Sequence, residues 1–180
     1  MKSRILILTL LFAALVSFPR LSIPAEKATQ EDAVRMVEMA GKMIEEMGDA
    51  ALAQISDPSG RCFDCEKNLY VFVYSDDVVL LADPFRQNLV GVSFSRHPED
   101  YGEESASVTV ANRIVEKAVH DGSGWMDYPD EIPGTFQIST KHTYEKLFRH
   151  AGKNYIVCCG VWYKEPPVSV PRTEPVEYSY

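Results

Sequence analysis

Residues 69–84 have the sequence LYVFVYSDDVVLLADP, and this stretch decides the fold class. Residues 69–74 are aromatic, β-branched or leucine, a composition that is typical of a β-strand. Residues 75–77 are Ser-Asp-Asp, which predicts a tight turn, and residues 78–82 predict a strand that returns beside the first. Asp83-Pro84 ends that strand. The stretch therefore predicts a β-hairpin with an antiparallel pair.

Helical patterns lie on both sides of this hairpin. Thr29 and Asp32 have the spacing of a capping box, and apolar residues then recur at three- and four-residue steps until Gly48, after which a short second helix is expected. Residues 107–120 show a similar amphipathic pattern, and Gly122 is placed to end that helix. The sequence thus predicts a long helix before the hairpin and a helix in the long loop after it.

Three more strands are expected in the C-terminal half, near residues 124–128, 139–148 and 155–163. The predicted order is a long helix, a hairpin, a loop that holds a helix, and then three strands. Hairpin-type connections between successive strands favour an antiparallel sheet with helices packed on it, which is an α+β architecture with five strands.

The N-terminal residues 1–25 have the pattern of a signal peptide. Lys2 and Arg4 form a basic head, and residues 5–18 are almost wholly apolar. A membrane-spanning helix needs about 20 apolar residues, so this run is short for a span. Cleavage is expected near Ala25, and an uncleaved N-terminal anchor is the alternative. No later run is apolar enough for a span, so the predicted location is periplasmic or secreted.

The remaining chain is expected to form one domain, residues 26–164, followed by a proline-rich disordered tail, residues 165–180. The 180-residue chain carries 18 basic and 26 acidic side chains, a formal charge of −8. Because phosphate neutralisation supplies most of the affinity for nucleic acids, this balance argues against a nucleic-acid partner.

The cysteines are candidates for a disulfide. An oxidising compartment favours pairing, either between Cys62 and Cys65 or between that loop and Cys158 or Cys159 on the last strand. A redox centre at Cys62 and Cys65 is the alternative, although the helix start that lowers a thiol pKa is absent there. Cys158 and Cys159 are adjacent on a strand and so point to opposite faces, which argues against a four-thiolate metal site. No cofactor is expected.

Several stretches resemble, in their order and spacing, the single Cache domains of bacterial extracytoplasmic sensors. The matching stretches are GDAALAQISDPSG (48–60), LYVFVYSDDVVLLADP (69–84), NLVGVSF (88–94), GSGWMDYP (122–129), KHTYEK (141–146) and YIVCCGVWY (155–163). The resemblance implies a PAS-like five-stranded antiparallel sheet with a long N-terminal helix across one face. It also implies a small-ligand pocket between the sheet and residues 84–122. Members of this family sense small organic molecules, often short carboxylates, and are commonly fused to chemoreceptor or kinase modules.

The chain departs from the family pattern at the expected pocket rim. Asp83 stands where a histidine is common, and Asp130 and Glu131 replace an aromatic and polar pair. These changes mean that the identity of the ligand cannot be carried over from the family.

The resemblance implies that the strands carrying residues 125–128 and 141–144 wall the pocket. A lysine, tyrosine hydroxyls and an indole N–H around an apolar body suit a small carboxylate. The alternative is that the aromatic residues are packing and the lysine is a surface charge. The candidate ligand-binding residues are Tyr74, Arg96, Trp125, Tyr128, Lys141 and Tyr144.

The sequence shows no motif of an enzyme, because its histidines, glycines and serines lack the spacing of metal, phosphate-binding or nucleophile-elbow sites. The predicted function is an extracytoplasmic sensor that binds a small organic ligand, with a carboxylate favoured. It is expected to signal through a partner, such as a membrane sensor kinase or a chemoreceptor. The alternatives are the thiol redox protein above and an interaction or scaffold module with a vestigial pocket.

Overall fold

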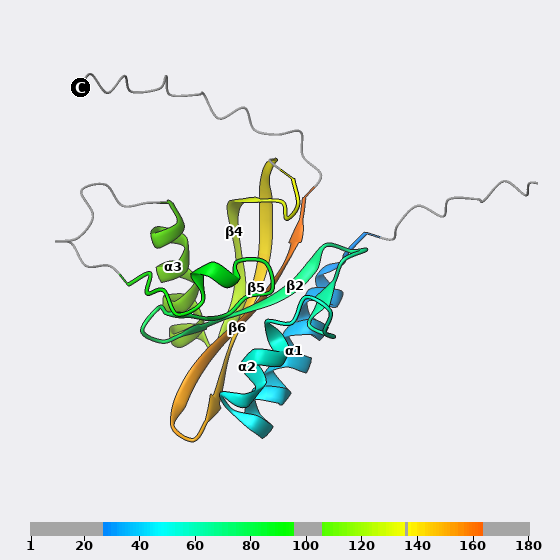
Figure 1. Cartoon of the computed structure of the whole chain (residues 1–180). Coiled ribbons are helices and arrows are strands. Elements are labelled where there is room, and N and C mark those ends of the chain that lie inside the picture. Colours follow the sequence, from blue (N-terminus) through cyan, green and yellow to red (C-terminus); the bar gives the residue numbers. More distant parts are fainter. Residues whose placement is uncertain (1–26, 96–105, 136, 164–180) are drawn as a thin grey trace, which may run out of the picture.

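The computed structural model describes residues 27–95, 106–135 and 137–163, and its elements follow the predicted order (Figure 1). The helices are α1 (Gln30–Met47), α2 (Ala50–Ile55), the 3-10 helix η1 (Gln87–Leu89) and α3 (Ala106–Asp121). The strands are β1 (Phe63–Asp64), β2 (Leu69–Ser75), β3 (Leu80–Ala82), β4 (Ser123–Glu131), β5 (Ile138–His150) and β6 (Lys153–Trp162).

The strands of the described residues form one antiparallel sheet in the order β1-β2-β6-β5-β4, with β3 also paired to β2. Strands β1 and β3 share one edge of β2, since Phe63 pairs with Tyr70 and Ala82 pairs with Val73. The α+β architecture and all five predicted strands are confirmed. Strand β1 is an addition, and its two residues are too few to leave a periodic pattern in the sequence.

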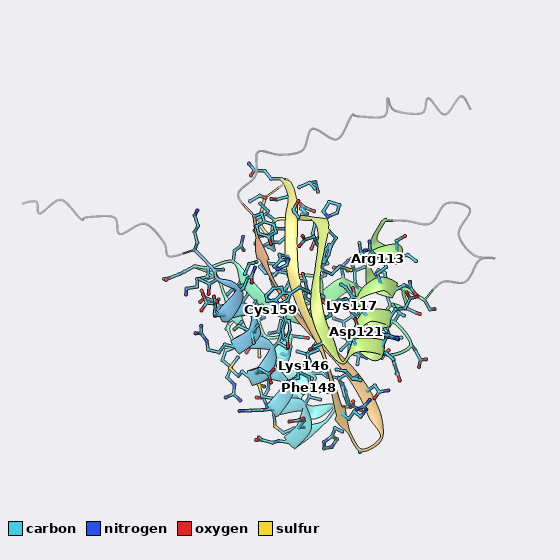
Figure 2. The ribbon with its side chains drawn as sticks, turned by 180° about the vertical axis from the view of Figure 1, so that it is seen from behind. Arg113, Lys117, Asp121, Lys146, Phe148 and Cys159 are labelled. Atoms are coloured by element: carbon cyan, nitrogen blue, oxygen red, sulfur yellow. The ribbon has the colours of Figure 1, made fainter. Side chains whose placement is uncertain are left out.

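Helix α1 covers one face of the sheet. Its start is the predicted capping box, in which the Thr29 hydroxyl accepts from the Asp32 N–H and the Asp32 carboxylate accepts from the Thr29 N–H, each at 3.1 Å. The apolar stripe of α1 packs on β2, β5 and β6. At Gly41 the helix approaches β5 so closely that an added Cβ would lie 2.1 Å from Cζ of Phe148. Figure 2 shows Phe148 on the side of β5 that meets α1.

Helix α3 covers the opposite face, so the sheet lies between two cores (Figure 1). Strand β2 contributes to both, because its successive side chains alternate between faces. Leu69, Val71 and Val73 belong to the core beneath α1, and Tyr70 and Phe72 belong to the core beneath α3. Residues 69–74 are therefore apolar or aromatic at every position because both faces of β2 are covered.

The structure corrects the expected disulfide, since the four cysteines are free thiols. Cys62 is buried beneath α1 whereas Cys65 is exposed, so this pair points apart. Cys62 and Cys159 share the core beneath α1, but Val71 lies between them, pairing with Cys159 and donating its N–H to the Cys62 carbonyl. Two strand spacings separate their backbones by about 10 Å, and a disulfide tolerates no more than about 7 Å. Cys158 points to the opposite core.

Three of the sequence predictions concern residues outside the described ranges: the signal peptide (1–25), the proline-rich tail (165–180) and Arg96. None of the helices in the described ranges has the length and apolar character needed to cross a membrane.

Candidate ligand-binding site

A cavity of about 350 Å³ lies on the α3 side of the sheet. It is bounded by β2, β4, α3 and the segment that follows β3. Its volume is at the lower end of the range of about 300–1,000 Å³ that small-molecule sites occupy. The lining residues are Phe72, Tyr74, Leu80, Asp83, Arg86, Leu89, Phe94, Val110, Ile114, Tyr128, Pro129, Asp130, Glu131 and Ile138.

Aromatic rings form much of the wall. Tyr74 and Tyr128 were predicted from the sequence as ligand residues, and both line the cavity together with Phe72 and Phe94. The Phe72 and Tyr74 rings meet at 86° with centroids 5.9 Å apart, and the Tyr74 and Phe94 rings meet at 82° and 6.2 Å. Burial raises the pKa of both tyrosines, which keeps them neutral phenols. The wall is therefore apolar with neutral hydroxyl groups.

An Asp-Pro turn positions the cationic residue of the wall. The Asp83 carboxylate accepts from the backbone N–H groups of Phe85, at 2.7 Å, and Arg86, at 2.8 Å. These bonds close the turn after β3 and place Arg86 at the cavity, where its guanidinium forms an ion pair with Asp130 of β4. Burial raises the pKa of Asp83, and its hydrogen bonds with the two N–H groups and the charge of Arg86 partly offset this.

Lys141 is fully buried behind this wall and does not line the cavity. Its Nζ donates to the Tyr70 hydroxyl at 2.7 Å and lies 3.5 Å from Oδ2 of Asp130. It also lies 4.1 Å from the centroid of the Tyr70 ring and 4.8 Å from that of Phe72. The chain reaches Tyr70 by crossing β6 at Gly160, where an added Cβ would lie 2.8 Å from Cε of Lys141. Lys141 therefore affects the cavity only indirectly. Its charge helps to hold the carboxylate of Asp130, which does line the cavity.

The other two predicted strand residues lie on the opposite face. Trp125 stacks on His142 at 4.3 Å and lies 5.2 Å from Tyr144, and both Trp125 and Tyr144 pack against the core beneath α1. Residue pairing between β4 and β5 explains this, because Trp125 is opposite Tyr144 in one pair and Tyr128 is opposite Lys141 in another. Paired residues share a face, and these two pairs are three positions apart, so they point in opposite directions.

Sequence reasoning missed Arg86, Phe94 and the role of Asp130. In the sequence, Asp83 and Asp130 stand out only as departures from the family pattern at the expected pocket rim. Arg86 follows an Asp-Pro pair, a turn signal that places a residue but does not reveal its partner 44 positions later.

Cys62 does not have the environment of a reactive thiol. Burial raises the pKa of Cys62 to about 11, which disfavours the thiolate that redox exchange requires. Within residues 27–95, 106–135 and 137–163, no three histidine, cysteine or acidic side chains are grouped to hold a metal ion.

A second buried carboxylate lies away from the cavity, beneath the last turns of α3. Glu145 of β5 is inaccessible to solvent, and neither carboxylate oxygen has a hydrogen-bond partner within the described part of the chain. Burial raises the pKa of Glu145 to about 7, although the charge of Lys117 opposes this rise. Lys117 is paired with Asp121 on α3 at 2.8 Å (Figure 2).

The comparisons with known proteins identify the architecture. No family model matches the sequence, and no curated protein matches it. Among solved structures, a Cache chemosensory domain described for carboxylic acid recognition superposes with a TM-score of 0.55 over 73% of this chain and 91% of that one, at 22% identity. This chain has a Cache fold.

Two further solved structures share the Cache fold over the same 73% of this chain. The periplasmic sensor domain of a chemotaxis protein has a TM-score of 0.51 and 19% identity over 88% of its length. A methyl-accepting chemotaxis protein from Vibrio parahaemolyticus has a TM-score of 0.54 and 13% identity over 86% of its length. At these identities the likeness establishes the fold, and the ligand has to be argued from the cavity itself.

Proposed function

We propose that this protein is an extracytoplasmic sensor domain that binds a small organic molecule in the cavity beside α3. The observation that carries the proposal is a ligand-sized cavity whose aromatic wall also holds a fixed ion pair, Arg86 with Asp130. Turn geometry and a buried lysine hold that pair in place, so its polar groups are positioned before a ligand arrives.

The proposed ligand remains a small organic molecule. One similar structure is described for carboxylic acid recognition, which supports the carboxylate that the sequence favoured. Two observations weigh against a simple carboxylate here. Lys141, the expected positive site, is behind the wall, and Arg86 at the wall is already paired with an acidic residue.

The proposed location rests on the sequence, and the proposed partner rests on the similar structures. The signal-peptide pattern of residues 1–25 supports export to the periplasm or beyond. The similar structures include sensor domains of chemotaxis proteins, which supports a partner of the chemoreceptor type or a membrane sensor kinase.

Thermal unfolding with a panel of short carboxylates, amino acids and small amines tests the proposal. A ligand at 100 times its Kd stabilises the protein by about 2.7 kcal/mol, a readily measured shift. The variant Val110→Trp places an indole in the cavity from α3, and Val119→Trp makes the same change at an exposed position on the same helix.

We expect a ligand from the panel to stabilise the wild type and Val119→Trp but not Val110→Trp. A stabilising ligand that acts equally on both variants would place the binding site elsewhere. The absence of a shift with every compound would refute the proposed function.

A further inference from the structure

Among the described residues, acidic side chains outnumber basic ones at the cavity. Asp83, Asp130 and Glu131 line it together with one cation, Arg86. Lys141 adds a second cation behind Asp130. Within the described part of the chain, three carboxylates therefore face two cations, and a ligand carboxylate would add to this excess of negative charge in a space partly shielded from water. A positively charged ligand would instead neutralise it.

The Arg86 guanidinium already has a carboxylate partner that belongs to the protein. The Asp130 side chain is only 12% exposed, and its Oδ1 also accepts from the Glu131 N–H at 2.9 Å. A ligand carboxylate that took Arg86 would leave Asp130 with Lys141 at 3.5 Å as its remaining cation. Breaking a partly buried ion pair in this way is costly, whereas a cation can bind beside it and leave it intact.

The aromatic wall has the chemistry of a site for ammonium groups. Phe72, Tyr74 and Phe94 follow one another around the wall, and neighbouring rings meet at nearly right angles. Tyr128 adds a fourth ring from β4. Aromatic faces attract cations most strongly where water is excluded, and several rings around one space are how proteins hold methylated ammonium groups.

We propose that the cavity binds a small cationic amine, with its alkylammonium group among the four rings and its charge balanced by Asp83, Asp130 and Glu131. This inference rests on the proposed function, because it names the ligand class for the same cavity. It differs from the sequence-based expectation of a carboxylate.

Isothermal titration of the whole protein with matched probes tests this ligand class. Choline and tetramethylammonium carry the charge, 3,3-dimethyl-1-butanol has the shape of choline without the charge, and acetate and propionate represent carboxylates. We expect choline to bind about ten-fold or more tightly than its neutral analogue, because the cation–π and ionic contributions depend on the charge. We expect acetate and propionate to bind more weakly than choline.

Three variants locate the interaction. Phe94→Leu removes a ring with little change in volume, and Glu131→Gln removes a charge at an exposed rim position that forms no ion pair in the described structure. Each should weaken choline several-fold while leaving the neutral analogue nearly unchanged. Tyr163→Leu is the control, since Tyr163 is exposed and packs near His142 on the far side of the sheet.

Asp130→Asn tests the internal carboxylate directly. It frees Arg86, so acetate should bind this variant more tightly than the wild type, whereas choline should bind less tightly. Circular dichroism first shows that the variant is folded, and Glu131→Gln tests the charge argument if it is not.

Two results would overturn the inference: a neutral analogue that binds as tightly as choline, or propionate that binds the wild type more tightly than both ammonium probes. If that tighter binding of propionate is abolished by Val110→Trp, the amine is refuted and the proposed function stands. Failure of every compound, in this set and in the broader panel, would refute both.

Discussion

Replacement of Glu145 by glutamine should change how the stability of this protein depends on pH. The carboxylate of Glu145 is buried without a hydrogen-bond partner in the described structure, and its pKa rises from 4.5 to about 7. Between these two values the unfolded chain loses the proton while the folded protein keeps it. The unfolded state therefore binds fewer protons, and the free energy of unfolding falls as the pH rises through this window.

The size of the effect follows from the pKa shift of Glu145. At about 1.4 kcal/mol for each pKa unit, ionisation of this group costs the folded protein about 3 kcal/mol between pH 4.5 and pH 8. Glutamine has a similar shape and no charge at any pH. Glu145→Gln should therefore be close to the wild type in stability at pH 4.5 and more stable than it by about 2–3 kcal/mol at pH 8.

Urea unfolding followed by circular dichroism at several pH values measures this difference. Subtracting the wild-type profile from that of the variant removes the contribution of the histidines and other groups. Glu116→Gln, which removes an acidic charge at an exposed position of α3, is the matched control. A Glu145→Gln profile that runs parallel to the wild type from pH 4.5 to pH 8 would refute the reasoning, because it would mean that Glu145 titrates normally in the folded protein.

Three other predictions concern packing and thiol chemistry. Gly41→Ala should lower the free energy of unfolding, measured by urea unfolding, by about 1–3 kcal/mol, although alanine is the better helix former. Phe148→Leu should recover part of this loss. A Gly41→Ala variant more stable than the wild type would contradict the close approach of α1 to β5. Ellman's reagent should modify one thiol of the native protein, Cys65, and a disulfide found by mass spectrometry would contradict the structure. Gly160→Ala should cost about 1–3 kcal/mol by the same assay, and less in a background where Lys141 and Thr143, whose side chains lie nearest to the added Cβ, are both alanine. Equal costs in the two backgrounds would exclude steric coupling between position 160 and these side chains.

Most of the fold could be predicted from the sequence because each of the longer helices and strands has a local signal of its own. The capping pair at Thr29 and Asp32 begins α1, the backbone of Gly122 has a φ of +81° where α3 ends, and the hairpin stretch forms β2 and β3. Strand β1 and helix η1 were not predicted, since two or three residues carry no measurable period. The disulfide was expected from the compartment, and it is absent because side-chain direction and strand spacing oppose it.

The site was predictable only in part, because it depends on which face of the sheet each residue occupies. Tyr74 and Tyr128 line the cavity. Trp125 is on the same strand as Tyr128, and Tyr144 pairs with Trp125 from the next strand, yet both lie on the other face of the sheet. Assigning residues to a pocket by strand ignores the alternation of faces. The partnership of Arg86 with a distant aspartate arises from tertiary packing and has no local signature.

The path of Lys141 across β6 also limits how this sequence can change. Lys141 and Thr143 together occupy the space that a side chain at position 160 would need, since an added Cβ would lie 2.5 Å from Oγ1 of Thr143 and 2.8 Å from Cε of Lys141. A lineage that replaced Gly160 would have to make room at both positions, and shortening the lysine would release Asp130 from the cation behind the cavity wall. That one substitution would alter the packing of the sheet and the charge at the cavity together.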